Sequence, residues 1–154
     1  MANRSRLLVA IMVAATALGW LVSLSCAAVR AGYADKASPT LLVQIELRRK
    51  QMSAPTQERQ QQMTAMGMRT DNPGVQRVFI YLYQPLTPAQ ADELRALSIT
   101  LYPDSWIPPT GNHPAGFMLA DMPVDKLEAL AAKDFVIRLD TAETRLEPQG
   151  RKDQ

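Results

Sequence analysis

The sequence predicts an α+β domain of the ferredoxin-like type, in which two helices cover one face of a four-stranded antiparallel sheet. After residue 75, segments with strand and helix character follow in the order β-α-β-β-α-β, which is the split βαβ pattern of that fold. The two halves also share a helix motif, LRAL at 94–97 and LEAL at 127–130. The order and the repetition together place the domain at residues 75–140.

The first strand of this domain is expected at 77–83, where the sequence reads RVFIYLY. β-Branched and aromatic residues in such a run are typical of a buried strand. Because successive side chains of a strand point to opposite sides, the strand has two different faces. The aliphatic face, expected to lie under the helices, consists of Val78, Ile80 and Leu82. The aromatic face consists of Phe79, Tyr81 and Tyr83.

Capping and turn residues predict the remaining elements. Thr87 is a helix N-cap, Pro88 takes the first helical position and Gln90 completes a capping box. The second strand is expected at 99–102 and ends at Pro103, because proline has no amide hydrogen for a sheet ladder. The later elements are a loop at 104–114, a strand at 116–120, a helix led by Pro123 and a strand at 135–139.

Two helices are expected before the sheet, in a linker segment at 30–74. Ser38 and Pro39 begin an amphipathic helix that runs to about Met52, and a glutamine-rich helix follows at 56–66. We expect the aromatic face of the sheet to remain open, since an exposed apolar face of this kind indicates a partner. The alternative is that these two helices fold back and cover that face.

The first 29 residues form a leader. Two arginines precede an apolar run at 7–24, and small residues follow, which is the order of a signal peptide. The run at 7–29 is also long enough to cross a bilayer once, so an uncleaved membrane anchor is the alternative. Either interpretation places the rest of the chain outside the cytoplasm, in a periplasm or extracellular, soluble or anchored. A third interpretation makes Cys26 a lipid attachment site.

The composition excludes several classes of function. The net charge is +2 and charges of both signs are mixed along the chain, so nucleic-acid binding is not expected. Cys26 is the only cysteine and His113 the only histidine, which excludes an intrachain disulfide and an ordinary structural zinc site. Ser105 and Asp121 are near His113 in sequence, but that alone does not position a catalytic set. We predict no enzyme activity, no cofactor and no metal site.

Two apolar clusters have two interpretations each. Met63, Met66 and Met68 offer thioethers that bind Cu(I), but methionine is also a common filler of irregular cores, and we favour that role. The segment 106–109 reads WIPP and is large, apolar and stiff. Trp106 either plugs the edge of the core or forms an exposed binding tip, since tryptophan often anchors interfaces.

Two stretches of the predicted domain are similar to a known family. They read RVFIYLYQPLTPAQADELRAL at 77–97 and GFMLADMPVDKLEALAAKDFVIRLD at 116–140. The first resembles the opening strand and helix of the inhibitor-type prodomains of subtilisin-like serine proteases. The second resembles the third strand, second helix and closing strand of the same prodomains. The resemblance covers residues 76–148, about half of the chain.

The resemblance implies a mode of binding. In that family the open sheet face packs on two helices of the protease, and the segment after the last strand enters the active-site cleft like a product, a form of β-augmentation. Acidic residues near this edge can cap helix N-termini of the protease. Carried to this chain, the contact residues would be Phe79, Tyr81, Tyr83, Asp140, Glu143, Arg145 and Leu146.

The chain differs from a full prodomain because no protease domain follows, only a polar tail at 141–154. The expected function is therefore that of an exported inhibitor or folding helper that binds a subtilisin-like protease in trans. The alternative is an envelope interaction module of the same fold with a non-protease protein partner. The first function needs the tail, whereas the second does not. An uncleaved leader would add the membrane as a second contact.

Overall fold

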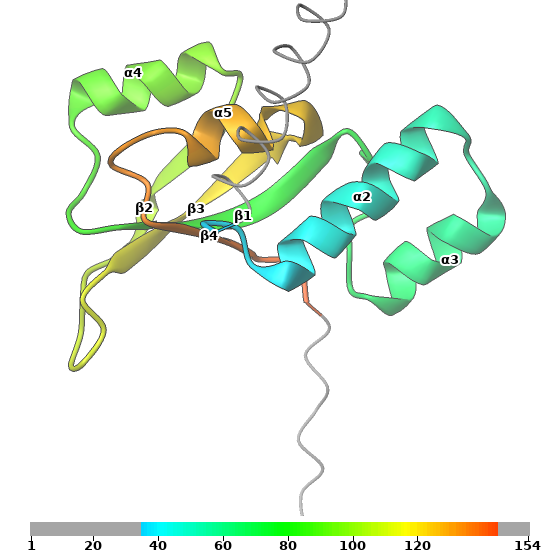
Figure 1. The fold of residues 1–154 in the computed structure, drawn as a ribbon, viewed down its shortest axis with the longest axis horizontal. Coiled ribbons are helices and arrows are strands. Elements are labelled where there is room, and N and C mark those ends of the chain that lie inside the picture. Colours follow the sequence, from blue (N-terminus) through cyan, green and yellow to red (C-terminus); the bar gives the residue numbers. More distant parts are fainter. Residues whose placement is uncertain (1–34, 145–154) are drawn as a thin grey trace, which may run out of the picture.

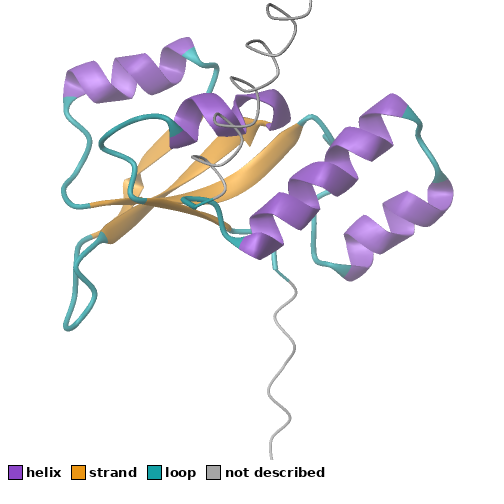
Figure 2. Ribbon diagram, in the orientation of Figure 1, coloured by secondary structure: helices purple, strands orange, loops and turns teal. Residues whose placement is uncertain are grey.

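The computed structural model describes residues 35–144, so the leader and the last ten residues lie outside the described part. Four antiparallel strands form one sheet in the order β2-β3-β1-β4. Helices lie over one face of this sheet (Figures 1 and 2). The elements in chain order are α2 (Pro39–Ser53), α3 (Gln57–Ala65), β1 (Val75–Leu82), α4 (Pro88–Ala96), β2 (Thr100–Ile107), β3 (Gly116–Pro123), the 3₁₀ turn η1 (Val124–Lys126), α5 (Leu127–Ala131) and β4 (Arg138–Thr141).

The two central strands, β1 and β3, alternate strictly between buried and half-buried residues. On β1, Val78, Ile80 and Leu82 are fully buried, which confirms the predicted aliphatic face. Their neighbours on β3 are Ala120, Met118 and Gly116 in register, so one face of the sheet is continuous and apolar. The helices contribute the rest of this core with Leu94 of α4 and Leu127, Leu130 and Ala131 of α5.

The capping signals were reliable guides to the helices. The Thr87 hydroxyl accepts a hydrogen bond from the Gln90 amide, and the Gln90 side chain accepts one from the Thr87 amide, so the predicted capping box is formed. Ser38 caps α2 and Pro39 is its first residue, as expected. The observed bounds of α2 and α3 lie within about one residue of the predicted ones.

Helix α2 lies on the same face of the sheet as α4 and α5, where it contacts β4 and η1 (Figure 1). Its Leu41 and Ile45 belong to the main core together with Leu139 of β4. The folded body therefore includes α2. The alternative in which α2 and α3 cover the aromatic face is wrong, because the buried stripe of α2 completes the aliphatic core instead. Helix α3 packs outside α2, through a small cluster made of Leu47, Met63, Met66 and Met68.

The two edges of the sheet differ. Segment 36–38 runs parallel to the outer side of β4, where the Leu139 amide donates to the Lys36 carbonyl at 2.7 Å and the Ser38 amide donates to the Leu139 carbonyl at 2.9 Å.

Strand β2 forms the other edge. The prediction that β2 ends at Pro103 is wrong: the strand continues to Ile107 through an irregularity in its register with β3. An edge strand tolerates a proline whose missing donor faces outward or lies at a bulge.

The last strand is also shifted from its prediction. It was expected at 135–139 and is observed at 138–141. The Val136 amide donates to the Lys133 carbonyl in a turn after α5, and the Val136 side chain is buried in the core without joining the ladder. Apolar residues that fill the core from a turn therefore resembled the beginning of a strand.

Candidate partner-binding face

The face of the sheet opposite the helices, which we call the open face, is lined by half-buried side chains. Strand β1 contributes Arg77, Phe79 and Tyr81, and their partners in register on β3 are Asp121, Leu119 and Phe117. Strand β2 adds Tyr102 beside Leu119, and β4 adds Arg138 beside Tyr81 and Asp140 beside Phe79. No described helix covers this face. Water therefore reaches rings that the opposite face would have buried.

Three aromatic rings form the centre of the open face. The Phe79 and Phe117 rings meet edge to face with their centroids 5.1 Å apart. The Tyr81 and Phe117 centroids are 5.5 Å apart with the rings tilted by 43°. Aromatic pairs at such distances stabilise each other, and rigid rings expose a large apolar area at little conformational cost. The centre of the face is thus preorganised and apolar.

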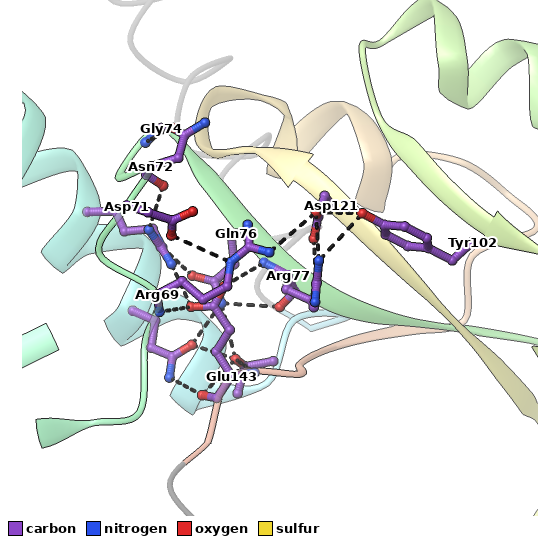
Figure 3. Close-up of polar contacts among 12 residues, drawn as sticks. Arg69, Asp71, Asn72, Gly74, Gln76, Arg77, Tyr102, Asp121 and Glu143 are labelled. Atoms are coloured by element: carbon purple, nitrogen blue, oxygen red, sulfur yellow. Dashed lines mark hydrogen bonds and ion pairs between the residues drawn. The ribbon is translucent and has the colours of Figure 1, made fainter. Parts of the chain in front are cut away.

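One end of the open face is polar. The Arg77 guanidinium binds both carboxylate oxygens of Asp121, at 2.8 and 3.0 Å, and the Tyr102 hydroxyl donates to the same carboxylate at 2.8 Å. Figure 3 shows these three side chains in a row. The hydrogen bonds from Arg77 lower the pKa of Asp121, and Asp121 in turn raises the pKa of Arg77. Asp121 is therefore held as a carboxylate.

The β4 edge of the face carries a second charged pair. Arg138 lies over the Tyr81 ring, 5.6 Å from its centroid, and donates to Asp140 at 3.0 Å. Asp140 also accepts from the Ser38 hydroxyl at 2.6 Å and from the Thr141 amide at 2.8 Å. An apolar centre with a polar rim is the usual anatomy of a protein-binding surface.

Glu143, which the sequence placed at the partner surface, lies inside the protein with only 4% of its surface exposed. Its carboxylate accepts hydrogen bonds from the buried Arg48 side chain at 2.5 Å and from the amides of Arg69 and Arg77, both at 3.0 Å (Figure 3). A carboxylate with three donors inside the protein has no free side for a partner. Its expected role as a helix cap for a protease does not fit this burial.

Arg69 connects the buried carboxylate to the open face. Its guanidinium lies 3.8 Å from Glu143 and 3.6 Å from Asp121. Its Nε, buried and without a hydrogen-bond partner, is also 3.9 Å from Asp71. These distances are too long for hydrogen bonds but short enough for electrostatic attraction. Arginines and carboxylates thus alternate from α2 to the rim of the open face.

Trp106 lies away from the open face. It packs against the core on the helix side, at the rim of a groove of about 320 Å³ between α4 and β2. A β-carbon at Gly116 would lie 2.6 Å from the Trp106 ring, so only glycine permits this approach. The groove is apolar apart from Arg95. This contact matches the interpretation in which Trp106 plugs the edge of the core.

The other predicted contact residues are distributed as follows. Phe79 and Tyr81 lie together on the open face, Tyr83 is 69% exposed just beyond the end of β1, and Asp140 is at the rim. Arg145 and Leu146 lie outside the described residues. Five members of the face were not predicted from the sequence: Arg77, Tyr102, Phe117, Leu119 and Asp121. The alternation of FMLADM at 117–122 contained the signal for three of them.

Two of the residues considered for chemistry, Ser105 and Asp121, have partners within the sheet. The Ser105 hydroxyl donates to the Tyr102 carbonyl and accepts from the Leu119 amide, so it serves the β2–β3 irregularity, and Asp121 is paired with Arg77. Within residues 35–144 no group of three His, Cys, Asp or Glu side chains is arranged to hold a metal ion. Across the same residues, no helix has the length and apolarity needed to cross a membrane.

Comparison of the chain with protein families, with curated proteins and with solved structures finds no match. The function of the chain is therefore inferred from its sequence and from the geometry of the open face.

Proposed function

We propose that this protein is an exported inhibitor-like or chaperone-like module that binds a subtilisin-like serine protease through its open face and its C-terminal tail. We also propose that residues 75–141 adopt the ferredoxin-like arrangement. That proposal is supported by the antiparallel order β2-β3-β1-β4 and by the positions of α4 and α5 over one face of the sheet. The leader at 1–29 would deliver the module out of the cytoplasm.

The observation that carries the proposal is the open face itself. Phe79, Tyr81 and Phe117 remain accessible at the centre of a rigid sheet, although α2 and α3 were long enough in sequence to have covered them. Exposed apolar patches on a folded body mark sites of association. The apolar centre with its charged rim has the chemistry of a protein-binding surface, and the partner expected on it is the side of one or two protease helices.

The tail would act together with the face. The chain leaves the described part at Thr144, next to the beginning of β1 and near the polar end of the open face. A partner seated on the face would thus meet the residues that follow. An extended segment pairs readily with the substrate-binding strand of a protease cleft, because main-chain hydrogen bonds supply affinity without demanding a particular sequence. In this arrangement the face supplies most of the binding energy and the tail blocks the cleft.

The test is inhibition of a purified subtilisin-like protease by the full chain, kept in mild detergent because of its apolar leader. Three variants are compared with it: a chain ending at residue 144, Phe79→Ala on the open face, and Val43→Ala as a control. Val43 is an exposed apolar residue of α2, on the side away from the sheet. We expect the shortened chain to bind without inhibiting, Phe79→Ala to bind at least tenfold more weakly, and the control to behave like the wild type.

A folded, uncleaved protein that neither binds nor inhibits such proteases would overturn this proposal. The open face would then point to the alternative function, an envelope interaction module with a non-protease partner. Removal of the tail would not affect binding in that case, whereas Phe79→Ala still would.

A further inference from the structure

The last described segment, residues 141–143, is held by side chains of α2, a helix about a hundred residues earlier in the sequence. Gln44 donates to the Glu143 carbonyl at 2.7 Å and accepts from the Thr141 hydroxyl at 2.5 Å. Arg48 donates to the Glu143 carboxylate at 2.5 Å. Both α2 side chains are almost fully buried, with 1% and 0% of their surfaces exposed. The contact is therefore part of the interior and not a surface ion pair.

The buried hydrogen-bond network extends beyond Glu143 to Gln76 and Asn72. Besides Glu143, Arg48 donates to the Gln76 side chain at 2.7 Å and to the Asn72 carbonyl at 3.1 Å. Gln76 in turn donates to Gln44 at 3.0 Å. A buried charge pair is costly to desolvate, and apolar residues of similar size are often at least as stable in its place. Such a network is better explained by the geometry it imposes than by the stability it adds.

The network holds Glu143, which lies beyond the last residues that the sheet bonds. Strand β4 ends at Thr141, and beyond it one backbone bond, from the Ala142 amide to the Arg77 carbonyl at 3.1 Å, continues toward the end of the described chain. Glu143 is then fixed through its own polar groups. Its amide donates to the Thr141 hydroxyl at 3.0 Å, its carbonyl accepts from Gln44, and its carboxylate accepts from Arg48, Arg69 and Arg77.

We infer that Gln44 and Arg48 of α2 are positioning residues that clamp the segment 141–143 against the beginning of β1 and so set where the tail leaves the body. The inference rests on the proposed function, since it means that α2 contributes to inhibition by positioning the tail. Arg77 links the two parts directly. Its amide binds the clamped carboxylate while its side chain binds Asp121 on the open face (Figure 3). The clamp and the open face are therefore built on the same residue of β1.

The test is hydrogen–deuterium exchange of the full chain, read by mass spectrometry on fragments covering 141–144 and, for reference, β3. Arg48→Met keeps an unbranched apolar stem but removes the guanidinium and its donors. Lys50→Met is the matched control, because Lys50 lies on the same helix at the surface, paired with Glu46. We expect exchange at 141–144 to be at least tenfold faster in Arg48→Met, with β3 unchanged, and wild-type behaviour in Lys50→Met. Equal exchange at 141–144 in all three proteins would overturn the clamp.

Glu143→Gln serves where Arg48→Met fails to fold, since it keeps the volume but removes the charge and one of the two acceptor oxygens. It is expected to accelerate exchange at 141–144 alone, and exchange at the wild-type rate would again overturn the clamp. Inhibition is measured on the same proteins. Where the wild type inhibits the protease, the variants that lack the clamp should inhibit it at least tenfold more weakly. A wild type that does not inhibit refutes the proposed function, while the exchange measurement still decides whether the clamp exists.

Discussion

The two faces of strand β1 differ in how far their apolar side chains are buried. On the helix side, Val78, Ile80 and Leu82 are buried under α2, α4 and α5, and at most 1% of the surface of each residue is exposed. On the other side, Phe79 and Tyr81 are half-buried by their neighbours in the sheet alone. The first side consists of aliphatic residues that pack tightly. The second consists of rings that both pack against Phe117, Phe79 edge to face and Tyr81 tilted.

The difference separates stability from function within one strand. A domain of this size needs most of its apolar residues in a single core, and α2 enlarges that core instead of protecting the second face. Leaving three rings accessible forgoes stabilisation that a covering helix would supply. A face left open at that cost, and rimmed by ordered charges, supports the proposal that a partner binds there.

The largest expected effect tests this separation directly. Ile80→Ala should lower the free energy of unfolding by about 2–5 kcal/mol, because it removes a fully buried side chain from the core. Phe79→Ala, one residue earlier, should cost less, about 1–2 kcal/mol, because its ring is only partly withdrawn from water. Urea denaturation followed by circular dichroism measures both. Equal losses would mean that the open face is structural core and would break the comparison.

Much of the fold could be predicted because local and tertiary signals agree. The capping box at Thr87, the Ser38–Pro39 helix start and the alternation of RVFIYLY each correspond to structure formed by neighbouring residues. The errors occurred where tertiary contacts override local signals. Pro103 is accepted because β2 is an edge strand, and Val136 is apolar because it fills the core from a turn. Neither fact can be read from the few residues around it.

The site could be predicted only in part for a similar reason. Phe79 and Tyr81 were identified from alternation in one strand, but the identity of their partners depends on the register between β1 and β3. Glu143 is buried because of the position of α2. The acid looked like part of a polar tail, and only the placement of Arg48 against it reveals an interior ion pair. The hydrophobic pattern of α2 gives no warning that its charged residue Arg48 is buried.

A smaller effect concerns the polar end of the open face. Arg77 lowers the pKa of Asp121 below its ordinary value of 3.8. The ion pair therefore stabilises the folded state fully above that pH, and the contribution is lost as the pH falls through the lowered pKa. Asp121→Asn should cost about 1–2 kcal/mol at neutral pH, and its difference from the wild type should shrink in acid below pH 3.8. Urea titrations at several pH values provide the measurement.

A constant difference between Asp121→Asn and the wild type across that range would mean that the carboxylate is not what Arg77 stabilises. Asp125 makes a useful control. Its pKa is also lowered, by Lys126 beside it, but both residues lie on the surface of η1, away from the open face. Asp125→Asn should leave partner binding unchanged, whereas Asp121→Asn should weaken it by loosening the rim.

The smallest expected effect is at the opposite rim. Arg138 stacks over Tyr81 and pairs with Asp140, but its side chain is largely exposed, so Arg138→Ala should change stability by roughly 0.5 kcal/mol. Its effect on association should be larger, because a partner on the face would exclude water from the same contacts and strengthen them. Arg138 thus separates the two roles, because it contributes little to the stability of the free protein and is expected to contribute more to binding. A loss of affinity for the partner no greater than the loss of stability would remove Arg138 from the contact surface and restrict the binding site to the aromatic centre and the Arg77 end.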